Sequence, residues 1–561
     1  MYRRFTFFLL VSLIAVLAMA MAGCSGAPAG ESAAPAEDAA AEEAAAPDPE
    51  TADAAEEPSD GDAASMLVMA IAEDTASLDP ARAFETLPTI IHKATYDTLV
   101  SFPPGSVEQV VPSLAESWEI SDDGTVYTFT LADGAVFSNG DPVTADDVVF
   151  SFNRLKNVVG NPSFLAETVA SVEAPDEKTV VLTLEQPDPS ILAKLVFGGY
   201  SVVNKAEAEA QGATDSEDAA TADTAEEWFN QNSAGSGAYV LESWEPGVET
   251  VLVRNENYWG EPAAIERVII RNIPEAATQK IQLEAGDIDI AMDLSSDQVP
   301  SLQENADVAV YEGLSDTLIF LKGNQDPEIG GPASDPLVME AVRNAIDYEG
   351  VRLLSGGQAA SPASMLPVGF LGAYEANAGI TRDVEKAQAL LAEAGYADGL
   401  DIEIAYPDFT YAGVNFGTFA QKVQADLNEA GFNATLAPAE VQVALEAYRQ
   451  GTEPFGLWLW LPDYRDSLDY VEFLPDGVVG TRTNWTEETA DEEILALRDA
   501  LKVETDDEAR AAMFAEMQDY LMAQGPYAPI LQPGIQIGLA GGLEGFVYNP
   551  QWRVDLALLN K

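Results

Sequence analysis

The chain has 561 residues, of which 47% are hydrophobic, and its 94 acidic and 27 basic residues give a net charge of −67. Such a charge repels nucleic-acid phosphates and argues against a nucleic-acid partner. It also disfavours anionic ligands and steers cationic ones in, although a solvated acidic surface, for instance in a salty habitat, is the simpler explanation.

The N-terminus has the pattern of a secretory signal. Arg3 and Arg4 precede an apolar run that exits through small residues to Cys24, the only cysteine. One alternative is that the run is retained as a membrane helix, since about 18 apolar residues nearly span a bilayer. We expect instead that residues 1–23 are a signal peptide cut before Cys24, because Met21–Cys24 resembles a bacterial lipobox. Acylation of Cys24 would account for a single thiol, which leaves no intrachain disulfide and no Cys-based metal cluster.

Residues 24–64 are predicted to be an acidic, disordered tether. From residue 25 they contain no Lys, Arg or aromatic residue, and they carry 12 acidic residues. Such a stretch cannot bury enough apolar surface to offset chain entropy, and its charges extend it. A propeptide without further role is the alternative. The body from residue 65 onward is long enough for more than one compact unit, and no second apolar run has membrane length.

The first strongly patterned part of the body is residues 118–157. The turn "SDDG" precedes "TVYTFTL", whose alternating aromatic and threonine residues predict a half-buried strand after a hairpin turn. Thr144 then begins a helical pattern in "TADDVVFSFNRLKN", and Asp147 three residues later completes a capping box. We expect a strand, a turn and an amphipathic helix here.

Further along, helices and short strands alternate. Helical periodicity covers residues 384–394 and 416–430, each followed by a glycine, and Asp335-Pro336 is a helix start. Between them lie the strand-like runs "GLDIEIAYP", "FNATLAPA" and "PFGLWLWLP". This alternation predicts α/β layers, with sheets covered by helices.

The residues do not call for catalysis. His92 is the only histidine, so it cannot form a histidine-ligated metal cluster, and we expect an ordinary helix residue there. A Ser-His-Asp triad would have to use His92, and no nucleophile-elbow sequence accompanies it. Paired carboxylates for glycoside hydrolysis occur by chance in so acidic a chain. We therefore predict no catalytic residue, no resident metal and no cofactor.

One long segment identifies a family. Residues 112–157, "PSLAESWEISDDGTVYTFTLADGAVFSNGDPVTADDVVFSFNRLKN", closely resemble the signature of family 5 extracellular solute-binding proteins. These are the peptide-, dipeptide- and nickel-type receptors of bacterial ABC importers, and the resemblance continues over residues 66–555. It implies a type II periplasmic-binding-protein-like α/β fold of two lobes, with an extra subdomain in the first lobe and a ligand cleft between lobes. The implied parts are the lobe I core at 65–98, 233–315 and 530–561, the extra subdomain at 99–232, and lobe II at 316–529.

The resemblance also suggests binding residues. In peptide-binding relatives, an aspartate in a Trp-x-x-Asp-Tyr context receives the peptide ammonium, and "WLPDY" places Trp460, Asp463 and Tyr464 in that pattern. Trp458 lies on the same strand face as Trp460, which would either wall the cavity or fill the core. Family position alone adds three further residues, Phe84, Asn324 and Ser236.

The site for a ligand carboxylate is less defined. Dipeptide-binding relatives use a basic side chain of lobe II. Between Leu353 and Trp458 this chain offers only Arg382, Lys386, Lys422 and Arg449, none in a matching motif. This departure leaves room for longer peptides or a non-peptide solute.

Together these patterns predict a binding protein rather than an enzyme. We expect a monomeric receptor at the cell surface, held to the outer face of the cytoplasmic membrane only through its N-terminal lipid. It would capture an oligopeptide-like ligand by lobe closure and deliver it to an ABC permease. The alternatives are a receptor for a sugar or metal chelate, and a surface hydrolase that uses paired carboxylates.

Overall fold

The computed structural model describes residues 66–379 and 381–561. The predicted signal peptide, the Cys24 lipidation site and the acidic tether lie outside these residues. Within the described part of the chain, no helix is long and apolar enough to cross a membrane.

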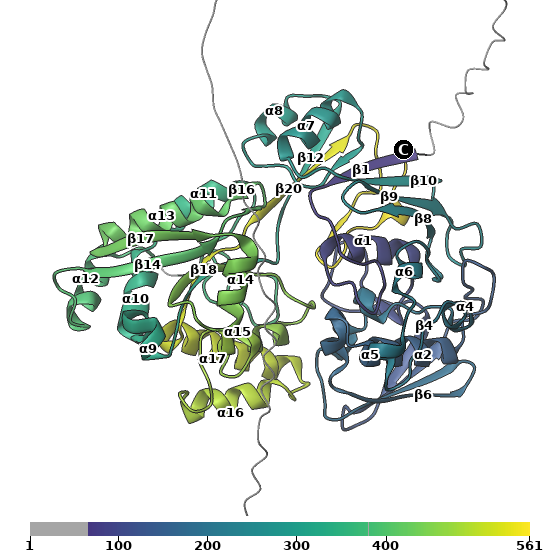
Figure 1. Ribbon diagram of the computed structural model, residues 1–561, viewed down its shortest axis with the longest axis horizontal. Coiled ribbons are helices and arrows are strands. Elements are labelled where there is room, and N and C mark those ends of the chain that lie inside the picture. The colour runs from purple at the N-terminus through teal and green to yellow at the C-terminus, as the bar shows by residue number, and fades with distance from the viewer. Residues whose placement is uncertain (1–65, 380) are drawn as a thin grey trace, which may run out of the picture. The chain divides into compact units, whose positions relative to one another are not determined.

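The first lobe is built on a seven-stranded mixed sheet (Figure 1). Strand β1 lies at its centre, parallel to β10 and β11, and the other pairs are antiparallel. The strands in spatial order are β12 (Val308–Leu314), β20 (Gly534–Ala540), β11 (Ile290–Ala291), β1 (Met66–Ile71), β10 (Arg267–Asn272), β9 (Glu249–Arg254) and β8 (Tyr239–Glu245). Its helices are α1 (Thr86–Thr95), α7 (Ala276–Ala285) and α8 (Val299–Gln303). Apolar cores lie on both sides of this sheet, with β1 contributing alternate residues to each.

A four-stranded antiparallel sheet forms a subdomain next to this lobe. Its order is β4 (Ala115–Ile120), β5 (Val126–Leu131), β7 (Thr179–Leu184) and β6 (Val169–Asp176). The predicted strand is confirmed as β5, and the predicted helix as α2 (Ala145–Val158), with the Thr144–Asp147 capping box formed. The chain continues through short helices α3 (Ile191–Lys194), α4 (Lys205–Ala210), α5 (Ala219–Ala222) and α6 (Glu226–Phe229).

A buried ion cluster joins the subdomain helix to the first lobe. Arg154 of α2 bonds both oxygens of Asp79, at 2.6 and 2.7 Å, and also Asp223, at 2.7 and 3.1 Å. Arg82 adds bonds to the same two carboxylates. Two arginines therefore neutralise two aspartates, and each charge is hydrogen-bonded, as buried charges require. We call these four residues the lobe I ion cluster.

The second lobe contains a five-stranded sheet. Its order is β17 (Phe432–Ala439), β14 (Leu400–Pro407), β18 (Phe455–Trp460), β13 (Leu318–Gly323) and β19 (Tyr527–Leu531). Its helices are α9 (Pro327–Gly330), α10 (Pro336–Ala345), α11 (Tyr348–Ser355), α12 (Val384–Glu393), α13 (Phe416–Glu429), α14 (Val441–Arg449), α15 (Val478–Arg482), α16 (Glu492–Leu501) and α17 (Asp507–Gln524). The helices predicted at 384–394 and 416–430 are confirmed, and Asp335 caps α10.

Two chain crossings join the sheets, from β12 to β13 through residues 315–317 and from β19 to β20 through residues 532–533. Ser315 donates to the Pro533 carbonyl from its backbone N–H and from its hydroxyl, each at 2.9 Å. The Gln532 amide donates back to the Ser315 carbonyl at 2.8 Å. The crossings are therefore bonded to each other. Short strand pairs complete the description: β2 (Val100–Ser101) with β3 (Val111–Pro112), β15 (Thr410–Tyr411) with β16 (Val414–Asn415), and β21 (Tyr548–Asn549) with β22 (Arg553–Val554).

Candidate functional site

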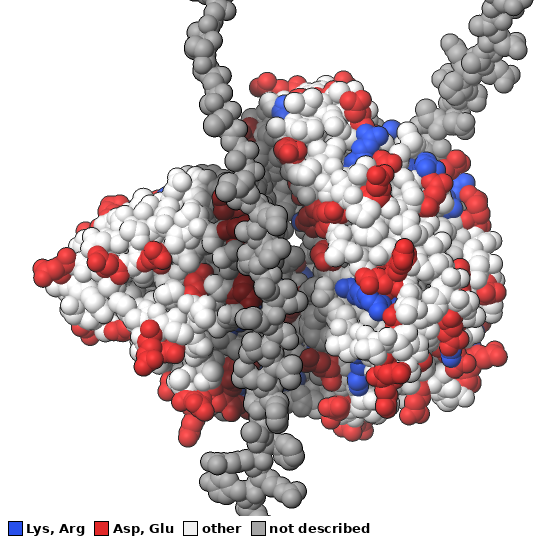
Figure 2. Space-filling model, in the orientation of Figure 1, with Lys and Arg blue, Asp and Glu red and all other residues white. Residues whose placement is uncertain are grey.

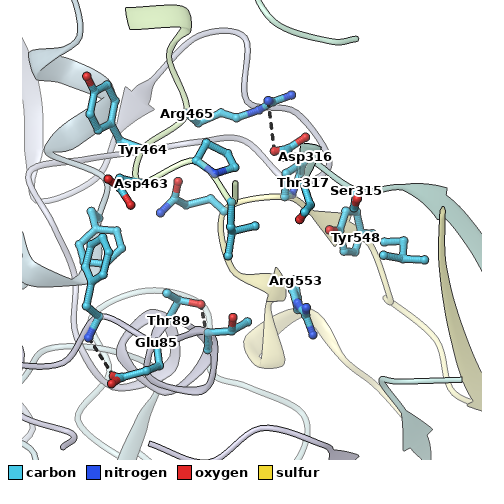
Figure 3. Close-up of a pocket in the computed structure, with 18 of the residues that line it drawn as sticks. Glu85, Thr89, Ser315, Asp316, Thr317, Asp463, Tyr464, Arg465, Tyr548 and Arg553 are labelled. Carbon is cyan, nitrogen blue, oxygen red and sulfur yellow. Dashed lines mark hydrogen bonds and ion pairs between the residues drawn. The ribbon is translucent and has the colours of Figure 1, made fainter. Parts of the chain in front are cut away.

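A cavity of about 280 Å³ lies where the two lobes meet. It is lined by the start of α1, the crossing at Ser315–Thr317, the loop that follows β18, and the C-terminal hairpin β21–β22 (Figure 3). This volume is close to the lower end of the roughly 300–1,000 Å³ typical of small-molecule sites. The lining residues are Phe84, Glu85, Thr86, Thr89, Phe197, Ser315, Asp316, Thr317, Tyr411, Leu461, Pro462, Asp463, Tyr464, Arg465, Ile535, Tyr548, Pro550, Gln551 and Arg553.

Asp463 stands on the loop that leaves β18. The backbone N–H of Asp463 donates to the Asp469 carboxylate at 3.3 Å, and the same oxygen accepts the Trp460 indole N–H at 2.7 Å. Trp460 and Asp469 therefore hold the loop in place. The Asp463 carboxylate itself accepts no hydrogen bond from the described residues. Burial, and then the charge of Glu472, raise the pKa of Asp463 to about 7, while Arg482 opposes the shift.

Glu85, the residue before α1, is a second lining carboxylate that forms no ion pair with the residues that the structure describes. Among the described residues, its hydrogen-bond donors are both neutral: the Thr75 hydroxyl at 3.0 Å and the Phe84 backbone N–H at 3.1 Å. Within the described part of the chain, no basic group therefore pairs with the Glu85 carboxylate in the cavity wall.

Arg465 is two residues beyond Asp463, and its guanidinium turns toward the chain crossing. Its Nη1 lies 3.1 Å from Asp316 Oδ2, Nη2 donates to the Gly369 carbonyl at 3.3 Å, and the guanidinium lies 3.7 Å from the Phe370 ring centroid. Burial raises the pKa of Asp316, and Arg465 opposes that shift. The pair connects the Asp463 loop to the crossing between the lobes.

Arg553 lies on the other side of the cavity from Asp463 (Figure 3). Its backbone is left-handed, with φ of 59°, a conformation uncommon for a residue other than glycine. Its guanidinium forms ion pairs with Glu73 at 3.4 Å and Asp293 at 3.5 Å. The positive charge of Arg553 is therefore shared between two carboxylates.

Aromatic rings make part of the wall apolar. The Phe84 ring packs against Phe164 and Phe197, with centroids 5.4 and 5.1 Å apart. Across the cleft, the Lys194 ammonium of the subdomain lies 4.8 Å from the Tyr464 ring centroid. This cation–π contact joins the subdomain to the Asp463 loop.

The structure brings three of the residues expected from the sequence, Asp463, Tyr464 and Phe84, to one cavity. The other four are buried elsewhere. Trp458 and Trp460 lie in the core on one face of β18, with Leu457 and Leu459 on the opposite face. Trp458 donates to Glu453 at 2.7 Å and stacks on Tyr448.

Asn324 and Ser236 also lie outside the cavity lining. The Asn324 amide donates to the Gly451 carbonyl at 2.8 Å, and the Ser236 hydroxyl donates to Asp97 at 2.9 Å. Both side chains are fully buried. Their assignment as ligand contacts, like that of the two tryptophans, stays a prediction.

Sequence reasoning did not identify five charged residues at or beside the cavity: Glu85, Asp316, Arg465, Asp469 and Arg553. None of the four basic residues considered between Leu353 and Trp458 lines the cavity. Arg465 directly follows "WLPDY", so its position next to Asp463 in the sequence could have indicated that it lies near the site. Arg553 has no local signal, because only the fold brings it there.

Comparison with known proteins places the chain in a family. The model of the bacterial extracellular solute-binding proteins, family 5 middle region, matches residues 109–478. The chain belongs to this family, and its fold is the two-lobed, type II periplasmic-binding-protein fold.

Several relatives are similar along most of their length. The probable D,D-dipeptide-binding periplasmic protein DdpA of Escherichia coli K12 is 31% identical over 497 residues, covering 86% of this chain and 92% of that protein. Heme-binding protein A of Haemophilus influenzae is 26% identical over 476 residues, covering 81% and 84%.

Two solved structures illustrate the shared fold. HbpA2 from Haemophilus parasuis has a TM-score of 0.74 at 25% identity, covering 88% of this chain and 99% of that one. DppA from Helicobacter pylori, in complex with the peptide STSA, has a TM-score of 0.72 at 23% identity, covering 88% and 98%.

Proposed function

We propose that the protein is the receptor of a bacterial ABC importer, which captures a short peptide-like solute between its lobes and delivers it to a membrane permease. The observation that carries the proposal is the Asp463 carboxylate, which faces a cavity between two lobes and lacks a hydrogen-bond donor among the described residues. A ligand ammonium would supply a charge-assisted bond there. The cavity volume of about 280 Å³ favours a small ligand over a long peptide.

Lobe closure would be the working step. A ligand that touches Asp463 on one lobe and Phe84 on the other makes both contacts only in the closed form, so it shifts the population toward closure. The two crossings at residues 315–317 and 532–533 are short, as hinges between domains are. The Lys194–Tyr464 contact spans the same cleft and would add to closure.

Capture and release of an unchanged solute is our proposal, rather than turnover. The family consists of solute-binding proteins, and this supports a receptor over the alternative of a surface hydrolase. A non-peptide ligand is the second candidate, because one relative is a heme-binding protein and one structural neighbour was solved with agropinic acid. Mass spectrometry of the solute released from the denatured, freshly purified protein distinguishes these candidates. Short peptides support the main proposal, and a sugar or chelate would replace it.

The role of Asp463 is tested by Asp463→Ala. We expect affinity for a free-amine peptide to fall by about 1.5–3 kcal/mol, the scale of a hydrogen bond to a charged group. Isothermal titration calorimetry measures this loss. The matched control is Asp133→Ala, whose carboxylate is fully exposed on the subdomain and should leave affinity unchanged. Equal affinity of Asp463→Ala and the parent would remove Asp463 from the site.

We also propose that Cys24 carries the lipid that holds the receptor at the cell surface, with residues 25–64 as the tether and the body as a monomer. The sequence around Cys24 supports this attachment. Metabolic labelling with a radioactive fatty acid should mark the parent but not Cys24→Ala, and the variant should leave the membrane fraction. Labelling of the variant would contradict the assignment.

A further inference from the structure

The basic side chains of the cavity wall have carboxylate partners, whereas two of its carboxylates have no basic partner among the described residues. This difference bears on the charge of the ligand. Both guanidiniums that line the cavity already have carboxylate partners: Arg465 has Asp316, and Arg553 has Glu73 and Asp293. Each basic group is therefore neutralised by the protein itself.

The opposite holds for two of the lining carboxylates. Within the described ranges, neither Asp463 nor Glu85 forms an ion pair, and Glu85 is bonded only to neutral donors. Two further carboxylates stand behind Asp463, namely Asp469, whose Oδ2 bonds the Asp463 backbone, and Glu472. The cation whose charge acts on Asp463 is Arg482 of α15, which lies 4.9 Å from the Tyr448 ring centroid and outside the cavity lining.

The rest of the molecule adds to this local imbalance. Residues 65–561 carry a net charge of −57, obtained from the total of −67 by removing +2 for residues 1–24 and −12 for residues 25–64. Acidic side chains are distributed over the face seen in Figure 2, with few basic ones between them. A cleft in such a body concentrates cations and repels anions.

We propose that the ligand of this receptor is a net cation, namely an amine whose carboxylate is absent or masked, as in a peptide amide. The amine would bond Asp463, with Glu85 adding negative potential. Among the described residues that line the cavity, each cation already has a carboxylate partner. A free ligand carboxylate would therefore have to displace Asp316 from Arg465, or Asp293 and Glu73 from Arg553. The inference rests on the proposed function and names the chemical class of its ligand.

Competition between matched peptides tests this inference. The full chain in detergent is incubated with equimolar pairs of Ala-X dipeptides, one member a free acid and the other its C-terminal amide, with N-acetyl-Ala-X amide as the amine-free control. Retained peptides are quantified by mass spectrometry after rapid gel filtration. We expect each amide to be retained at least as well as its acid, and the acetylated form to be retained at least about tenfold less, as for a lost charged hydrogen bond.

The possible results separate this inference from the proposed function. Stronger retention of the acids than of the amides would overturn the inference and leave a peptide receptor in place. Retention of neither form would overturn both.

Variants of the two arginines provide a second readout. In Arg553→Gln and Arg465→Gln, the ratio of acid to amide retained should stay within about twofold of the parent, since neither arginine would contact a ligand carboxylate. A selective fall of about tenfold in acid retention would assign that arginine to the carboxylate and contradict the inference. Arg352→Gln on α11 is the matched control, because this half-buried arginine pairs with the exposed Glu349 and does not line the cavity. The parent competition remains decisive if either variant fails to fold.

Discussion

Two groups of charged residues in this protein differ in how completely their carboxylates are paired with cations. In the lobe I ion cluster, Arg82 and Arg154 neutralise Asp79 and Asp223, and every carboxylate is hydrogen-bonded. Beside the cleft, Asp463, Asp469 and Glu472 gather three carboxylates, and the carboxylate of Asp463 has no donor among the described residues. Burial raises the pKa of Asp463 but leaves the pKa of Asp223 lowered, because Arg154 offsets its desolvation. The lobe I ion cluster is therefore neutralised within the protein, whereas we propose that the Asp463 carboxylate takes its partner from the ligand.

The largest effect should follow from breaking the satisfied group. Arg154→Met replaces the guanidinium with an apolar, unbranched side chain. It leaves Asp79 and Asp223 buried with too few hydrogen-bond donors. We expect the free energy of unfolding to fall by about 3–5 kcal/mol. Urea unfolding followed by tryptophan fluorescence measures this. The control, Arg352→Met, breaks an exposed pair with Glu349 and should cost less than about 1 kcal/mol. Similar losses in both variants would show that the cluster is not structural.

The unsatisfied group should respond in the opposite direction. Because the pKa of Asp463 is raised from 3.8 to about 7 in the folded protein, the folded state retains a proton between these pH values that the unfolded chain releases. This contribution to stability is fully present below pH 4 and is lost as pH rises through 7. Asp463→Asn should therefore unfold like the parent near pH 4 and be more stable by about 1–3 kcal/mol at pH 8. Melting curves from pH 4 to 8, without ligand, test this, and parallel curves for the two proteins would contradict it.

The smallest effect concerns the cation–π contact between Lys194 and Tyr464, the residue next to Asp463. Tyr464→Leu removes the ring under Lys194 and should weaken ligand binding by about 0.5–1 kcal/mol, mainly through faster release. Tyr464→Phe keeps the ring and should bind like the parent. Stopped-flow dissociation rates measure the difference. If both variants release ligand at the parental rate, the contact does not contribute to closure.

Local signals in the sequence identified much of the fold. The capping box of α2 and the alternation of β5 depend on residues a few positions apart, so both could be predicted from the local sequence. The two-lobed fold and the candidate residue Asp463 were predicted from the family resemblance, and Asp463 lines the cavity.

The electrostatic character of the site could not be read in this way. Whether Asp463 is unpaired depends on where every other charge lies, and the relevant pairs join distant segments. Arg553 meets Asp293 across 260 positions, and Arg465 meets Asp316 at the crossing between lobes. Trp460 matched the family motif but packs in the core, where its indole bonds Asp469 and so supports the Asp463 loop from behind. In a chain with 94 acidic residues, no pattern distinguishes a neutralised carboxylate from an unsatisfied one.

The bonding between the two crossings limits how the lobes can move. The Ser315 hydroxyl donates to the Pro533 carbonyl, and the Gln532 side-chain amide donates to the Ser315 carbonyl, so each crossing is bonded to the other. Sliding one lobe past the other would break these bonds, whereas twisting both connections together would preserve them. We therefore expect the ligand-free and ligand-bound conformations to be related by a rotation about a single axis through Ser315 and Pro533. One rotation angle would then describe the transition.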